Sequence, residues 1–93
     1  MTVTLTGRLI CTSAHEAALV RQHLPEHLRL SRADAGCILF RIAQTSDPLV
    51  FEVEEVFASR ADFEAHRDRA RTSPWAEATA QLRRDYLLNE AQG

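Results

Sequence analysis

The side chains best suited to chemistry in this 93-residue chain are those of His66 and Trp75. His66 lies three positions after Phe63 in a segment with helical spacing, so the two share the helix face that turns toward the core. An imidazole can take a proton from a phenol near neutral pH or donate a hydrogen bond to its oxygen. An indole offers an aromatic ligand a flat apolar wall. The pair therefore suits a cavity for a small aromatic molecule; the alternative is that both side chains only pack.

Three further polar side chains could act beside this pair. Glu55 lies between apolar residues on the inward face of a strand rich in Val and Phe, residues 50–58. A buried carboxylate is costly without a partner, so we expect Glu55 to accept a hydrogen bond from His66 or to pair with Arg41. Tyr86 could donate a proton to a bound oxygen, or be a half-exposed strand residue.

Other kinds of site find little support in the sequence. His23 and His27 are four residues apart, a spacing that can hold a metal on a helix, but no third ligand is evident because Glu26 and His27 point apart. No metal site is predicted. The 11 basic residues are all arginines, which excludes a catalytic lysine. No Gly-rich phosphate loop or Gly-x-Ser-x-Gly motif occurs, so nucleotide and hydrolase chemistry are not indicated.

Composition narrows the class of protein. A length of 93 residues predicts a single domain over residues 1–93, and a net charge of -2 argues against nucleic-acid binding. Cys11 and Cys37 lack the spacing of a metal or disulfide motif and are expected to be free thiols. The sequence shows no signal peptide and no apolar run of the ~20 residues that span a membrane. We therefore expect a cytoplasmic protein without a membrane partner.

The elements that position these side chains follow the order strand, helix, strand, strand, helix, strand. The predicted strands are residues 3–11, 37–43, 50–58 and 83–90, and the predicted helices run from about 14 to 31, from 60, and from 74 to 82. Ser13, Ser59 and Ser73 are the predicted N-caps, and Pro25 is expected to kink or break the first helix. This order predicts an α+β, ferredoxin-like βαββαβ fold, an antiparallel sheet with the first and third strands central and helices on one face.

The other face of that sheet would remain uncovered. Several of its residues are Leu or Val, and an exposed apolar face usually marks an interface. Two copies that pack sheet against sheet about a two-fold axis would cover it, so a homodimer is predicted.

Four short motifs resemble those of the antibiotic biosynthesis monooxygenase family, small dimeric α+β barrels that include quinol monooxygenases. Residues 34–37, Asp-Ala-Gly-Cys, resemble a Glu-Pro-Gly-Cys turn. Residues 51–57 resemble a strand ending in Glu-x-Trp, with Glu55 as the glutamate and Phe57 in place of the tryptophan. Ala65-His66 resembles an Ala-His pair, and residues 73–75 resemble Ser/Thr-Pro-His with Trp75 in place of the histidine. The resemblance extends over nearly the whole chain.

The resemblance implies oxidation of a phenol, quinol or anthrone by O2 without a cofactor. His66 would be the base or hydrogen-bond donor, Trp75 and Phe57 pocket walls, and Tyr86 or Arg41 a donor to the developing oxyanion. The residues expected to act in catalysis are His66, Trp75 and Tyr86, and those expected to bind substrate are Phe57, Arg41, Glu55 and Phe63. Haem-degrading relatives use an Asn in the first strand, which this chain lacks, so haem degradation is not expected.

Two alternatives to an enzyme stay open at this stage. A non-catalytic dimeric domain of the same fold would bind a small aromatic molecule without turning it over. A purely structural dimer would have a filled core in place of the cavity. The first would show ligand-dependent stabilisation but no turnover.

Overall fold

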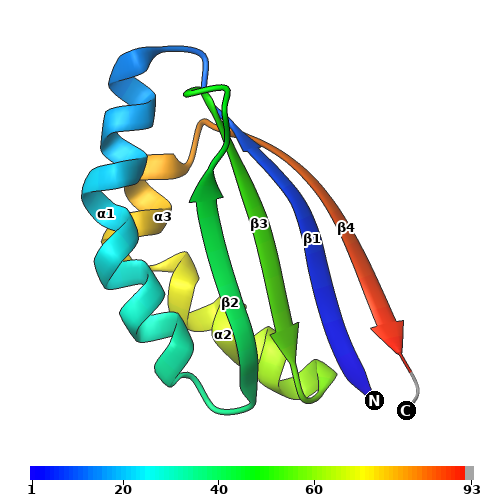
Figure 1. Ribbon diagram of the computed structural model, residues 1–93. Helices are drawn as coiled ribbons and strands as arrows, with labels where there is room; N and C mark the ends of the chain where they lie inside the picture. Colours follow the sequence, from blue (N-terminus) through cyan, green and yellow to red (C-terminus); the bar gives the residue numbers. More distant parts are fainter. Residues whose placement is uncertain (92–93) are drawn as a thin grey trace.

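Four strands and three helices make up the protein, whose computed structural model describes residues 1–91 (Figure 1). In chain order they are β1 (Thr2–Ile10), α1 (Ala14–Ala33), β2 (Cys37–Gln44), β3 (Val50–Phe57), α2 (Arg60–Arg71), α3 (Pro74–Thr79) and β4 (Arg83–Ala91). The predicted order of elements is confirmed. The third helix is shorter than predicted, because it ends at Thr79 and not at residue 82.

The helix starts follow from their caps. The side-chain oxygens of Ser13, Ser59 and Ser73 accept hydrogen bonds from the backbone N–H three residues on, at 3.2, 3.1 and 3.2 Å respectively. Each bond satisfies an N–H that the helix itself leaves free. Of the kink or break expected at Pro25, the break does not occur, because α1 continues through the proline to Ala33. One lost backbone bond is outweighed where the helix buries a side-chain stripe on both sides of the proline.

The sheet has the strand order β2-β3-β1-β4, and every neighbouring pair is antiparallel. β1 and β3 are central, as the crossover rule predicts. The three helices cover one face of the sheet (Figure 1), so the predicted ferredoxin-like α+β fold is confirmed.

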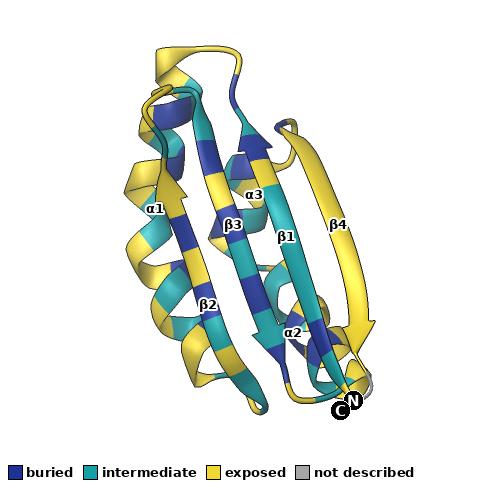
Figure 2. Cartoon of the chain, turned by 45° about the vertical axis from the view of Figure 1, so that its right-hand side comes forward, coloured by how far each residue is buried: buried dark blue, intermediate teal, exposed yellow. Residues whose placement is uncertain are grey.

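Buried residues alternate with more exposed ones along β3, whereas the edge strand β4 has no buried residue (Figure 2). Phe51, Val53, Glu55 and Phe57 of β3 are buried on the helix side, whereas all of β4 is exposed. The helices therefore cover β2, β3 and β1 but leave the inner face of β4 open. This opening is where a molecule can approach the space beneath the helices.

Gly7 lets β4 lie close against β1. A Cβ atom there would lie 2.0 Å from the carbonyl oxygen of Asp85, a separation that no side chain tolerates. Glycine in a strand often marks such a close approach of a neighbouring backbone.

Two other expectations concern the rest of the chain. Cys11 and Cys37 are free thiols, as predicted. Within residues 1–91, no helix has both the length and the apolar character needed to cross a membrane.

Candidate active site

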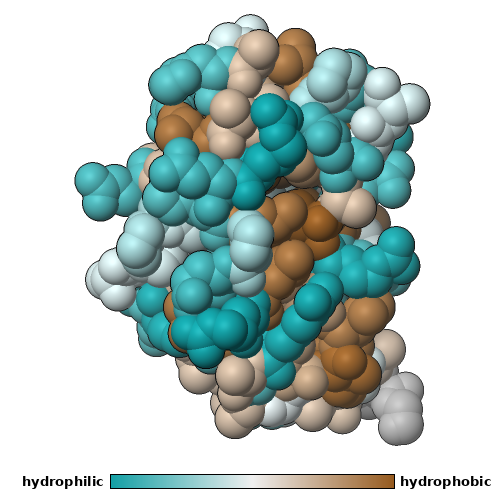
Figure 3. Space-filling view, turned by 60° about the vertical axis from the view of Figure 1, so that its left-hand side comes forward, coloured by the Kyte–Doolittle hydropathy of each residue, from teal (hydrophilic) through white to brown (hydrophobic). Residues whose placement is uncertain are grey.

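A cavity of about 420 Å³ lies between the inner face of the sheet and the helices. All seven elements contribute to its lining, from Leu5 of β1 to Leu88 of β4. The helix side of the molecule, turned forward in Figure 3, shows hydrophobic side chains in a hollow that hydrophilic side chains border. Pockets for small organic ligands have volumes of roughly 300–1,000 Å³, so the cavity can hold a small aromatic molecule.

The structure brings most of the predicted site residues to this cavity. Its lining includes His66, Trp75, Tyr86, Glu55 and Phe63. Phe57 lies behind the lining, fully buried, with its ring centre 4.9 Å from that of His66. Phe57 therefore supports the imidazole and does not form a wall of the cavity.

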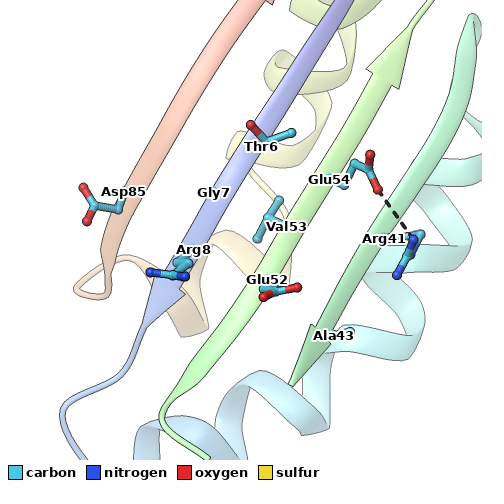
Figure 4. A pocket seen from close by; sticks show the side chains of 9 residues that line it. All are labelled: Thr6, Gly7, Arg8, Arg41, Ala43, Glu52, Val53, Glu54 and Asp85. Atoms are coloured by element: carbon cyan, nitrogen blue, oxygen red, sulfur yellow. Dashed lines mark ion pairs between the residues drawn. The ribbon is translucent and has the colours of Figure 1, made fainter. Parts of the chain in front are cut away.

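Arg41 lies on the opposite face of the sheet. In the strand register Phe40 faces Glu55, so the next residue, Arg41, points outward. There its Nη1 is 3.6 Å from Oε1 of Glu54, beside a polar hollow on the outer face (Figure 4). The expected pairing of Arg41 with Glu55 is wrong, and Arg41 is placed outside the cavity.

His66 is held by a carboxylate that follows α1. Its Nδ1 lies 2.8 Å from Oδ2 of Asp34. Arg69, one turn after His66 on α2, donates from Nε and Nη2 to the same carboxylate at 2.9 and 3.0 Å. Arg69 also donates to the buried hydroxyl of Ser31 at 3.1 Å. These contacts fix both α2 side chains against the end of α1.

This arrangement decides which nitrogen of His66 can act as a base. Burial would raise the pKa of Asp34, but hydrogen bonds from Arg69 and His66 lower it, so Asp34 is an anion that needs a donor. We therefore assign the proton of the neutral imidazole to Nδ1, which leaves the Nε2 lone pair on the cavity side. Burial lowers the pKa of His66 although Asp34 raises it, so the ring is neutral near pH 7.

Glu55 approaches His66 from the sheet. Its Oε1 lies 3.8 Å from Nε2 of His66, and among residues 1–91 it accepts no hydrogen bond. Burial raises the pKa of Glu55 to about 7, with a small opposing effect of Arg67. With His66 neutral, this contact is not an ion pair. The cavity instead holds a neutral base beside a carboxyl group that can carry a proton near pH 7.

Sequence analysis considered His27 only as half of a metal-binding pair, but the structure places it in the same cavity. Its ring is stacked on that of Trp75, with centres 4.4 Å apart and planes at 4°. His23, the other half of the suggested metal pair, lines a separate hollow. The helical stripe could have identified His27, because it lies seven residues after Val20 and four before Ser31, both buried.

Two more functional candidates were missed. Asp34 is 32 residues from His66 in sequence, and only its place in the Asp-Ala-Gly-Cys motif singled it out. Arg84 lines the cavity near Tyr86, and its Nη atoms donate to the backbone oxygen and hydroxyl of Thr79 at 2.8 and 2.7 Å. An arginine in an exposed strand carries no sequence signal that separates it from a surface charge.

Replacing Asp34 by asparagine is expected to make His66 harder to protonate, because the carboxylate that stabilises its imidazolium form is removed. Arg69 also loses its anion, at a cost of ~1 kcal/mol of stability. NMR titration of the histidine side chains measures the first effect. Asp68→Asn, on the exposed side of α2, is the matched control; an unchanged His66 titration in Asp34→Asn would contradict the assignment.

Comparison with known proteins places the chain in a family. The family model for antibiotic biosynthesis monooxygenases matches residues 4–78. Among solved structures, the chain is similar to SnoaB, a cofactor-independent oxygenase from Streptomyces nogalater, with 16% identity, a TM-score of 0.79 and coverage of 99% and 94% of the two chains. It is also similar to a Nitrosomonas europaea protein assigned to the antibiotic biosynthesis monooxygenases, with 21% identity, a TM-score of 0.79 and coverage of 98% of each chain. A third similar structure, the protein PA3566 from Pseudomonas aeruginosa, has 26% identity, a TM-score of 0.70 and coverage of 97% of this chain and 95% of that chain.

A search among curated protein sequences finds no significant relative. The family model nevertheless spans more than half of the chain, and it includes β3 and α2, which carry Glu55 and His66. The chain belongs to the antibiotic biosynthesis monooxygenase family.

Proposed function

We propose that the protein is a cofactor-independent monooxygenase that oxidises a phenolic, quinol or anthrone-type aromatic compound with O2. The observation that carries the proposal is the neutral imidazole of His66, which Asp34 orients toward a cavity of the right size. Family membership and the likeness to a cofactor-independent oxygenase support it.

The proposed reaction begins when Nε2 of His66 takes the phenolic or enolic proton of the substrate. The resulting anion gives an electron to O2 far more readily than the neutral compound does. A carbon–oxygen bond then forms, and the O–O bond breaks with loss of water. One oxygen atom stays in the product, the other leaves as water, and the substrate supplies all four electrons. Asp34 stabilises the imidazolium formed in the first step.

Donors to the developing oxyanion would come from β4. Tyr86 is 36% exposed, and the partial burial of its side chain raises its pKa to about 12. Its hydroxyl therefore keeps its proton at neutral pH and can donate it in a hydrogen bond. Arg84, fixed by Thr79, supplies a positive charge in the same lining. In this proposal Arg84 takes the oxyanion-donor role that the family resemblance implied for Arg41.

Oxygen consumption tests the proposal. A purified, chelator-treated protein with a panel of hydroquinones and anthrones is expected to consume O2 in a saturable way, above the rate of spontaneous oxidation. A rate equal to that of His66→Ala for every compound would contradict it, and ligand-dependent stabilisation without turnover would favour the binding domain.

We also infer that the protein is a homodimer joined through the outer face of the sheet. Leu87 is 61% exposed there, and Leu39 and Val56 lie on the same face, half-buried. The centre of the face is polar, with Arg8 beside Glu52 (Figure 4), so the contact would combine apolar edges with ion pairs. Sedimentation at micromolar concentration is expected to give twice the mass of the chain. A monomer over that range would contradict the inference.

A further inference from the structure

His27 is a buried polar side chain without a partner. It is 5% exposed, and within residues 1–91 neither of its nitrogens makes a hydrogen bond. Its Nδ1 is fully enclosed and unsatisfied, whereas its Nε2 keeps accessible surface and is the nitrogen that a ligand in the cavity can reach. Buried polar atoms in folded proteins are nearly always paired, so an unpaired one calls for a reason in function.

Two aromatic side chains pack against the ring of His27. Trp75 stacks on one face, and the ring of Phe40 meets it edge-on, with centres 5.3 Å apart and planes at 77°. Burial lowers the pKa of His27 to about 3, with further lowering by Arg69 and by the protonated form of His66, against the opposing effect of Asp34. His27 is therefore neutral over the physiological range, and its Nε2 can donate or accept one hydrogen bond, depending on the tautomer.

His27 and His66 line the same cavity from opposite helices, α1 and α2. Their ring centres are 6.2 Å apart, with the planes at 46°. That separation is too short for a ligand to lie between the rings, but one aromatic molecule that lies across both ring edges can contact both.

We propose that His27 is a specificity-determining residue that binds a second oxygen function of the substrate, while His66 holds the first. The inference rests on the proposed function and narrows it. The preferred substrates are small aromatic nuclei with two oxygen functions, such as a dihydroxyarene. A compound with one oxygen leaves the buried imidazole of His27 unpaired and binds less well, because a site built to hydrogen-bond a hydroxyl group rejects the analogue that lacks it.

Trp75 provides the readout, since it is the one tryptophan in the chain and lines the cavity. Quenching of its fluorescence under anaerobic conditions measures binding of 1,4-dihydroxynaphthalene and of 1-naphthol. We expect the wild-type protein to bind the diol roughly tenfold more tightly. His27→Phe keeps an aromatic ring against Trp75 and is expected to abolish most of that preference. His27→Gln retains polar atoms and is expected to keep part of the preference for the diol. The control His23→Phe is expected to keep all of that preference.

Two results would overturn the assignment: no preference for the diol in the wild-type protein, or the same preference in His27→Phe. If His27→Phe does not fold, the nitrogen NMR signals of His27 in the wild-type protein decide, because at saturation the diol must shift them further than 1-naphthol does. A protein that prefers the diol but consumes no O2 refutes the proposed function and leaves this inference standing. A protein that consumes O2 but does not prefer the diol supports the proposed function and refutes this inference.

Discussion

Replacing His66 by glutamine is expected to lower kcat/KM by about 10²–10⁴-fold, the usual contribution of a positioned general base. Glutamine has a similar length and can still form hydrogen bonds, but it cannot take a proton. Binding of substrate should therefore change much less than turnover. Because burial lowers the pKa of His66, the wild-type rate is expected to hold down to a pH below the ordinary histidine value and to fall only there.

Steady-state rates of product formation, measured across pH 5 to 9, test this expectation. The control is His15→Gln, an exposed residue at the start of α1. If His66→Gln retains a rate within twofold of the wild-type protein, His66 is not the base, whatever its position in the cavity.

Replacing Glu55 by glutamine is expected to stabilise the protein by on the order of 3 kcal/mol at pH 8 and to have no such effect at pH 4. Burial raises the pKa of Glu55 from 4.5 to about 7, so the folded protein keeps a proton that the unfolded chain has released. The free energy of unfolding of the wild-type protein therefore falls as the pH rises from about 4.5 to 7. Glutamine has no charge to bury and removes this loss.

Urea unfolding at pH 4 and pH 8 measures the difference. Glu54→Gln is the matched control, because Glu54 directly precedes Glu55 on β3 but lies on the outer face beside Arg41. His27 acts with the opposite sign in both proteins, since its pKa of about 3 makes the folded state lose stability as the pH falls below about 6.5. Equal stability of Glu55→Gln and the wild-type protein at pH 8 would show that the carboxylate is already well solvated.

The sequence predicted the elements better than the contacts between them. Serine caps, period-two strands and the crossover rule identified the order of elements and the central strands, because each of these signals is local. Glu55 was correctly singled out as an unusual carboxyl group on a buried face. Its neighbour across the hairpin was misassigned, since a single step in register moves Arg41 to the other face of the sheet.

The remaining site residues depend on contacts that no local pattern encodes. Asp34 meets His66 only because the end of α1 lies against the middle of α2, and His27 meets Trp75 only because α3 packs against α1. A buried histidine in a helical stripe is most simply a packing residue in the sequence. Its missing hydrogen-bond partner becomes visible only when the whole surroundings are known.

The central claim is that an imidazole held by a carboxylate lets O2 react with an aromatic anion without help from a cofactor. Incorporation of label from ¹⁸O₂ by chelator-treated, flavin-free protein tests it most directly, with 1,4-dihydroxynaphthalene as substrate and mass spectrometry of the product. The expected result is one ¹⁸O atom in each product molecule, formed far faster with the wild-type protein than with His66→Gln. Formation of labelled product at the same rate with wild-type protein, with His66→Gln and with buffer alone would contradict the claim.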